Sequence, residues 1–448
     1  TYFSCKGVIM NNFEKSEKHF NLKNYYPLII LSISLITRIC AAIYLSKNIV
    51  QVSDFKLAYE TASSLFFNDD YHKIFTHWIL YPNIIGVLFN IFGESQLVAF
   101  VFNAIICSVS AILIYYITNS ISKNNNVSLV ASFIYVLWPA NVLYIGILTP
   151  EHITSMLLLL GVFFFFNSEE EKDFLKKSIK LFMVGVCLGL TAFFKDFGII
   201  FIIALPFYYI LKMLYQGKNR IIVSMFCITI VLIGSSIAKQ FTYLYIDNLV
   251  GTKVSRNNTG FYLTEGLIST NDGQFSQKIK DEYFNEVIKN NYNYEAANEN
   301  ILNKLKEDIK NNDKLFELLW NKAKIVANGD TARLGFLARS AKECGNFSLA
   351  ENLQGTITYI NNFYFYIVIV LACIGLFRAI KYKETKLMYI YIAIFGCYLL
   401  LLLIEAQNRY IYGFIPFLCI LTKGTLLKCQ KKLTKKSVPK CKKISNNL

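Results

Sequence analysis

The stretch PLIILSISLITRICAAIYLSKNIV, residues 27–50, decides the fold class. It is almost wholly apolar and long enough to cross a bilayer as a helix, which takes about 20 apolar residues. It is also longer than the apolar core of a cleavable signal peptide, about 7–15 residues, although a Lys-containing polar leader precedes it. We therefore expect a first membrane-spanning helix that is retained in the protein.

The whole chain has the composition of a membrane protein. Of its 448 residues, 54% are hydrophobic and 17% are charged, whereas soluble domains carry about 25% charged residues. We expect an all-α integral membrane protein with about ten transmembrane helices, in a range of about nine to eleven because the fourth to sixth apolar runs are short or closely joined. The expected spans are 27–50, 96–118, 127–148, 152–167, 178–194, 197–215, 221–239, 359–377, 387–404 and 411–427.

The distribution of basic residues predicts how the chain is oriented. Lys and Arg number 46 against 30 Asp and Glu, for a formal net charge of +16. The basic residues lie in short clusters between apolar runs and in the C-terminal tail, which is typical of cytoplasmic loops. We expect both termini in the cytoplasm, residues 49–95 and 240–358 on the external side, and no nucleic-acid partner.

The apolar runs divide the chain into five parts. Residues 1–9 read as an upstream extension, because the chain begins with Thr1 and Met10 is a candidate start. The parts are a cytoplasmic N-terminal segment at 1–26, a transmembrane module at 27–239 with its first external loop at 49–95, an external subdomain at 240–358, C-terminal transmembrane helices at 359–427 and a basic cytoplasmic tail at 428–448.

The external subdomain has its own periodicity. Apolar residues recur three and four positions apart in ENILNKLKEDIK (299–310) and KLFELLWNKAKIVAN (314–328), which predicts two helices. The Gly-containing stretch RNNTGFYLTEGLISTNDGQF (256–275) reads as an irregular loop.

The first external loop begins with a carboxylate. In DFKLAYETASSLF (54–66), Phe55, Tyr59 and Ala62 recur at helical spacing, so we expect an amphipathic helix along the membrane surface that begins at Asp54. Asp54 could simply cap this helix, since Asp is favoured there, or it could be a functional group. The following apolar stretch HWILYPNIIGVLFNIF (77–92) predicts a second interfacial or re-entrant helix.

Ionisable residues occur at the external ends of several spans that are far apart in sequence. They are Asp54, Glu151, His152, Lys195, Glu405 and Arg409. The predicted topology brings these groups to one membrane depth, where an ionisable side chain is a functional candidate.

Structural interpretations of the same residues remain open. Lys195 and Arg409 could be snorkelling anchors, Glu405 could pair with Arg409, and His152 could be an interfacial polar tip. Arg38 lies deep in the first span, where a lone charge costs about 3 kcal/mol on insertion scales. It therefore needs an internal partner or an aqueous cavity.

The order of the motifs resembles that of a known superfamily. An apolar span is followed by SDFxxxYxxA, which contains Asp54 and Tyr59, then by YPNIIGVLFNIFGES, IYVLWPANVLYIGILTPEHITSMLLLL and a late EAQNRYIYGFIPFL. This order resembles the GT-C superfamily of polytopic glycosyltransferases. It is most similar to glycosyltransferase family 39, with the protein mannosyltransferase-like and aminoarabinose transferase-like bacterial membrane proteins.

The resemblance implies a reaction and a site. A sugar would move from a polyprenyl-phosphate carrier to an envelope acceptor (a glycan, a lipid or a protein) on the external face of the cell membrane, with Asp54 as catalytic base. The leaving lipid phosphate calls for cations, and the candidates are Arg409 and then Lys195. Acidic residues at the site could also hold Mg²⁺ or another divalent ion. Specificity would lie in residues 240–358.

Two other classes of function remain. A lipid-linked sugar flippase or transporter would place polar residues at the bilayer midplane and is typically built from internal repeats, whereas these residues gather at one face and no clear repeat joins the two halves. A non-catalytic envelope assembly protein would use the external subdomain for binding.

Overall fold

The computed structural model describes residues 22–217, 221–268 and 272–426, and this part of the chain is helical, without strands. The all-α fold class predicted from the sequence is therefore confirmed. The predicted upstream extension at 1–9 and the predicted basic tail at 428–448 lie outside the described residues.

Seven helices of the described part are long and apolar enough to cross a membrane, or eight if one bent pair counts as a span. All eight overlap predicted spans, although the helix that begins at Ile221 continues to Val250, past the predicted end of its span at 239. They are α2 (Tyr26–Leu45, with its 3₁₀ extension from Lys23), α6 (Gln96–Ser122), α9 (Glu151–Glu170), α11 (Gly198–Gln216), α12 (Ile221–Val250), α19 (Thr358–Lys381, continuous with a helical stretch from Phe347), α20 (Thr385–Leu403) and the bent pair formed by α7 (Asn125–Val136) with residues Pro139–Gly146.

Two predicted spans take a different form. The run at 178–194 forms α10 (Phe174–Leu190), a helix of 17 residues followed by a 3₁₀ turn at Thr191–Phe193. The run at 411–427 begins as a 3₁₀ segment, η6 (Asn408–Phe414), and continues as the short α21 (Ile415–Leu421), whose residues are all buried. A helix enclosed by other helices and a membrane span have the same apolar composition, so the total of about ten spans stays a prediction.

The helices of the first external loop agree with the predicted pattern. The amphipathic segment forms α3 (Asp54–Ser64), which buries Phe55, Ala58 and Ala62. It is followed by α4 (Asp70–Ile74), the 3₁₀ turn η2 (Thr76–Trp78) and α5 (Leu80–Phe92), the last of which is the predicted second apolar helix.

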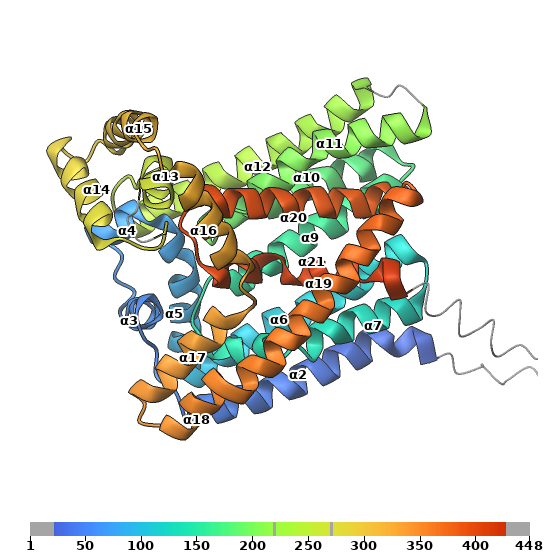
Figure 1. Cartoon of the computed structure of the whole chain (residues 1–448), viewed down its shortest axis with the longest axis horizontal. Helices are drawn as coiled ribbons and strands as arrows, with labels where there is room; N and C mark the ends of the chain where they lie inside the picture. Colours follow the sequence, from blue (N-terminus) through green and yellow to red (C-terminus); the bar gives the residue numbers. More distant parts are fainter. Residues whose placement is uncertain (1–21, 218–220, 269–271, 427–448) are drawn as a thin grey trace, which may run out of the picture.

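The helices of the segment predicted as an external subdomain gather beside this loop at one end of the molecule (Figure 1). Two of its helices, α15 (Tyr294–Lys310) and α16 (Leu315–Ala327), confirm the predicted periodicity. The others are α13 (Thr259–Ile268), α14 (Gln277–Lys289), α17 (Thr331–Glu343) and α18 (Phe347–Asn352). Residues of α3, α4, α13, α14 and α17 line the candidate site at this end.

The prediction of an irregular loop at 256–275 is wrong for its middle part, because Thr259–Ile268 is a helix. Glycine usually weakens a helix, but here two glycines allow close packing. A methyl group on Gly266 would overlap the backbone of Leu403 and Ile404, and one on Gly260 would approach Asn298 closely. The glycines that suggested a loop are therefore required by tertiary contacts.

Candidate active site

Asp54 is the first residue of α3 and follows a residue with unusual backbone geometry. Ser53 has φ 54° and ψ −137°, a positive φ that is strained for a residue with a side chain. Ser53 is the N-cap, and no side chain accepts a capping hydrogen bond from this helix end. The capping interpretation of Asp54 therefore gains no support, and its carboxylate is 45% exposed toward the cavity described below.

Arg409 lies in η6 and faces Asp54. Its Nη2 is 3.6 Å from Oδ2 of Asp54, which is an ion pair but longer than a hydrogen bond. The guanidinium is buried among the rings of Phe55, Phe336 and Tyr410, at 5.2, 4.9 and 5.2 Å from their centroids. Its Nε has no hydrogen-bond partner among the described residues. The aromatic rings therefore fix the position of a cation that keeps unused donors.

Lys195 lies in the turn between the 3₁₀ segment after α10 and helix α11. A methyl group on Gly198 would overlap the backbone of Leu188, so the turn folds tightly back onto α10. The Lys195 ammonium lies 4.1 Å from the centroid of the Tyr410 ring, within cation–π distance. Burial lowers the pKa of this ammonium, although neighbouring carboxylates such as Glu151 act in the opposite direction.

Glu405 follows α20 and has its own hydrogen-bond partners. One carboxylate oxygen accepts from the Tyr410 hydroxyl at 2.6 Å, and the other accepts from the Gln407 side-chain amide. The suggested pairing of Glu405 with Arg409 is thus replaced by the pair of Arg409 with Asp54.

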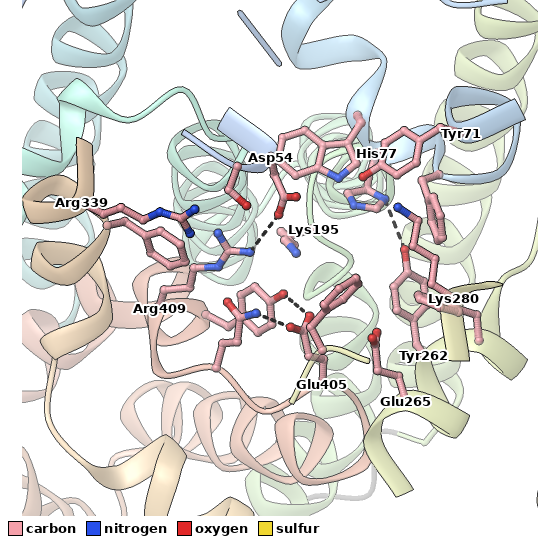
Figure 2. Close-up of a pocket in the computed structure, with 18 residues that line it drawn as sticks. Asp54, Tyr71, His77, Lys195, Tyr262, Glu265, Lys280, Arg339, Glu405 and Arg409 are labelled. Carbon is pink, nitrogen blue, oxygen red and sulfur yellow. Dashed lines mark hydrogen bonds and ion pairs between the residues drawn. The ribbon is translucent and has the colours of Figure 1, made fainter. Parts of the chain in front are cut away.

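These four residues line one cavity of about 330 Å³ (Figure 2). Figure 2 shows Asp54, Arg409 and Lys195 converging on its centre, with Glu405 on the adjacent wall. The remaining lining residues come from the first external loop, the subdomain and the segment after α20: Ser53, Tyr71, Phe75, His77, Trp78, Phe261, Tyr262, Glu265, Phe275, Lys280, Phe336, Arg339, Gln407 and Tyr410. We call it the polar cavity.

A second cavity of about 280 Å³ adjoins the polar cavity and is more apolar; we call it the apolar cavity. The two share lining residues, among them Lys195, Glu405 and Tyr410. Its further lining includes Phe194, Phe197, Ile199, Leu263, Leu400 and Ile404. An ammonium group therefore lies where a polar space meets an apolar one.

Two other candidate residues lie outside both cavities. Glu151 begins α9, is buried, and accepts a hydrogen bond of 2.9 Å from the Tyr144 hydroxyl. His152 is also buried, with its Nδ1 2.8 Å from the Tyr412 hydroxyl. Both side chains face the protein interior, and neither lines either cavity.

Arg38 and Tyr59 are also separate from the cavities. Arg38 is fully buried, donates from Nη1 to the Ser34 hydroxyl at 2.8 Å and lies 5.4 Å from the centroid of the Tyr135 ring. Among the described residues its Nε and Nη2 have no partner. Tyr59 packs its ring against Phe89, with centroids 5.4 Å apart.

Several charged and aromatic lining residues were missed by the sequence analysis. Glu265 lies in the segment predicted as a loop, although it is the only charged residue of the apolar run TGFYLTEGLI and could have been noticed for that reason. His77 lies in the stretch predicted as an apolar helix. Burial, reinforced by nearby Lys195 and Arg409, lowers the pKa of His77 well below its usual range.

Within the described ranges, no group of three or more His, Cys, Asp or Glu side chains is close enough to hold a metal ion. Asp54 and Glu405 are already engaged, one with a cation and one with two hydrogen-bond donors. The predicted divalent metal therefore stays a prediction.

The sequence and the fold were compared with known proteins. Residues 76–238, about a third of the chain, match the family described as dolichyl-phosphate-mannose-protein mannosyltransferase. No curated protein sequence matches the chain.

The fold is similar to that of the oligosaccharyltransferase from Archaeoglobus fulgidus. Its complex with Zn and sulfate gives a TM-score of 0.52 at 14% identity, covering 92% of this chain and 50% of that one. Its complex with an inhibitory peptide and a dolichol-phosphate gives 0.50 at 13% identity, covering 93% and 51%. ArnT from Cupriavidus metallidurans bound to undecaprenyl phosphate gives 0.36 at 11% identity, covering 92% and 81%.

The chain spans about half the length of the archaeal enzyme, and at this identity the likeness concerns the fold alone. The family match, unlike these structural matches, is a similarity of sequence. Over residues 76–238 the chain is similar in sequence to the dolichyl-phosphate-mannose-protein mannosyltransferase family, which confirms the resemblance inferred from its motifs.

Proposed function

We propose that the chain is a membrane glycosyltransferase that moves a sugar from a polyprenyl-phosphate carrier to an envelope glycan, lipid or protein at the external membrane face. One observation carries the proposal: the polar cavity with Asp54 and Arg409 adjoins the apolar cavity at Lys195. A lipid-phosphate sugar has the same arrangement, with a polar sugar, an anionic link and an apolar chain. Asp54 and Arg409 lie outside the matched residues 76–238 and Lys195 lies within them, but the match assigns no role to any of the three, so their proposed roles rest on geometry.

Asp54 is suited to act as the catalytic base. A sugar or protein hydroxyl is a poor nucleophile near neutral pH, and a positioned carboxylate that accepts its proton contributes about 10²–10⁴-fold in rate. The acceptor oxygen would attack the anomeric carbon as the bond from that carbon to the phosphate oxygen breaks. The proton passes to Asp54, and polyprenyl phosphate leaves with the electron pair.

Arg409 and Lys195 are suited to bind the phosphate. The charge that develops on the leaving oxygen is stabilised by cations that are already in position. Arg409 is held by three aromatic rings and retains donors, which suits the planar, two-point contact that arginine makes with phosphate. Lys195 lines both cavities and would hold the phosphate where the prenyl chain begins.

The apolar cavity would hold the first part of the prenyl chain. Its wall includes Phe194, Phe197, Leu400 and Ile404, from the segments that flank α11 and end α20. Burying these aliphatic and aromatic surfaces against a prenyl chain is favourable by about 25 cal/mol per Å² of apolar area. Both termini would lie in the cytoplasm, as the basic loops predict.

The proposal is tested by transfer in proteoliposomes. Purified protein is supplied with polyprenyl-phosphate sugars of different hexoses, and release of polyprenyl phosphate is measured with and without envelope extract. We expect release that depends on both substrates. Movement of the intact lipid between leaflets, without cleavage of the sugar–phosphate bond, would contradict transfer and favour a flippase. Mass spectrometry of co-purified lipid would name the donor independently.

A further inference from the structure

Glu265 is a buried acid that the proposed reaction does not yet use. It belongs to α13 of the external subdomain, is 2% exposed and lines the polar cavity. Figure 2 shows it on the far side of the cavity from Asp54, near Glu405. A carboxyl group this buried is rare in proteins unless it has a specific partner.

The packing of α13 fixes where Glu265 lies. The adjacent Gly266 lets the helix pack directly against the backbone at Ile404, because a side chain at this position would overlap it. Lys322, fully buried in α16, donates from Nζ to the carbonyl oxygen of Gly266 at 2.6 Å and to that of Ile404 at 2.7 Å. The two carbonyls are thus held together, and Glu265 is held beside Glu405.

The Glu265 carboxyl has unused hydrogen-bonding capacity. Its Oε1 accepts from the backbone N–H of Ser276 at 3.0 Å, and its other oxygen has no hydrogen-bond partner among the described residues. Burial raises the pKa of Glu265 to about 8, with the nearby charge of Glu405 adding to this, while Lys195 and Lys280 act in the opposite direction. The group is therefore neutral near pH 7 and can both donate and accept.

The surrounding wall fits a sugar. Aromatic rings of Trp78, Phe261, Tyr262 and Phe275 line the same cavity, and their faces suit the apolar face of a pyranose. Pockets of this kind combine an aromatic wall with a few placed polar groups that fix orientation. The two cations proposed for the phosphate lie elsewhere, Arg409 beside Asp54 and Lys195 at the centre (Figure 2). Lys280 lies on the Tyr262 side, with its ammonium 4.8 Å from the centroid of the Tyr71 ring.

We propose that Glu265 is the positioning residue for the donor sugar, so that the external subdomain determines which sugar is accepted. The proposal rests on the proposed function. The acceptor hydroxyl has to reach Asp54, which leaves the opposite side of the cavity for the sugar that is already joined to the phosphate. A carboxyl there makes hydrogen bonds to a sugar hydroxyl and none to the phosphate.

The experiment compares the binding of two lipids in detergent near pH 7. One is polyprenyl phosphate, and the other is whichever of polyprenyl-phosphate mannose, glucose or galactose binds the wild-type protein best. We expect Glu265→Ala to weaken binding of the sugar-carrying lipid about tenfold and to leave binding of polyprenyl phosphate unchanged. Glu265→Gln, which also donates and accepts, should stay within about threefold of wild type for both lipids. Arg409→Ala should weaken both.

A pH series gives a second readout that a structural role would not produce. The neutral form of Glu265 is the one that donates, so affinity for the sugar-carrying lipid should fall as pH rises through about 8 in the wild type. Glu265→Gln should lack this loss. Lys195, Lys280 and Glu405 are present in both proteins, so a loss of affinity that occurs only in the wild type requires the Glu265 carboxyl.

The possible results separate the two proposals. Glu265→Ala could lose affinity for both lipids equally, or Glu265→Gln could bind the sugar-carrying lipid as weakly as Glu265→Ala near pH 7. Either result would overturn the role of Glu265 in sugar binding and leave the proposed function standing. Wild-type protein that binds neither lipid would instead contradict the proposed function itself, and the inference with it. Thermal unfolding of each variant shows whether the fold is retained.

Discussion

Asp54 and Arg409 approach each other without closing a hydrogen bond, at 3.6 Å between Nη2 and Oδ2. A fully formed bidentate pair would occupy both groups, whereas this spacing leaves carboxylate oxygens and guanidinium donors free for the two substrates of the proposed reaction. The strained backbone of Ser53, at φ 54°, aims Asp54 at this point. Such strain persists only where the surrounding packing holds it.

We predict that Asp54→Asn loses at least about a hundredfold in transfer rate, because the amide cannot accept the proton of the acceptor hydroxyl. Initial rates with saturating lipid-phosphate sugar measure this. Ser53 and not Asp54 is the N-cap of α3, and Asn has nearly the size of Asp, so the melting temperature should stay close to that of the wild type. Near-wild-type transfer by Asp54→Asn would return Asp54 to a structural role.

Arg409 is predicted to act through the shape of its guanidinium as well as its charge. Arg409→Lys keeps the charge but loses the planar fork, so transfer should fall by about ten- to a hundredfold, and Arg409→Ala should fall further. Glu405→Gln is the matched control, since Glu405 bonds to Tyr410 and Gln407 and not to Arg409. Affinity for polyprenyl phosphate, measured in detergent, should drop far more in Arg409→Ala than in Glu405→Gln. Equal affinity across these variants would remove Arg409 from the site.

Sequence reasoning could predict part of this site because the bilayer fixes depth. Asp54, Lys195, Glu405 and Arg409 each follow or precede an apolar run, so topology alone brings them to one level. The same argument included Glu151, which the structure turns into the protein interior toward Tyr144. Depth can be read from apolar runs, whereas the direction of a side chain depends on how the helices are rotated against one another.

At the scale of elements, helices with clear 3.6-residue periodicity were predicted correctly, as α3, α15 and α16 show. Helix α13 was missed because its two glycines suggest a turn. Gly266, for example, is needed because α13 packs against the backbone of Ile404, which is more than a hundred residues away in the sequence. Glu265 was missed for the same reason, since only tertiary packing carries it to the cavity.

The packing of α13 gives a prediction about stability. Gly266→Ala places a methyl group against the backbone at Leu403 and Ile404, which cannot move as a side chain could, so we expect destabilisation of about 1–3 kcal/mol. Gly335→Ala is the control, because nothing lies within 4 Å of the added methyl. Alanine is the better helix former there, so the control should be neutral or gain up to about 1 kcal/mol. Thermal unfolding in detergent compares the two.

If Gly266→Ala were as stable as Gly335→Ala, the close approach of α13 to the end of α20 would be wrong, and with it the placement of Glu265. The two substitutions are chemically identical, so helix propensity cancels between them. Only the tertiary contact remains to distinguish the two positions.

For the molecule as a whole, the gathering of the first external loop and the subdomain at one end (Figure 1) makes the orientation of the chain decisive for the proposed function. Both cavities lie among these segments. If this end faced the cytoplasm, the site would meet a different set of acceptors. The basic loops predict that it faces outward.

A native cysteine tests this orientation. Cys344 is exposed and lies in the subdomain beyond α17, on the predicted external side. A membrane-impermeant maleimide should label Cys344 in intact cells, and Cys344→Ser should abolish that signal. In a Cys344→Ser background, cysteine introduced at the exposed Lys172, in a predicted cytoplasmic loop, should react only after the membrane is permeabilised. The reverse pattern would place the cavities on the cytoplasmic side, where a transferase acting on external acceptors could not reach its substrate.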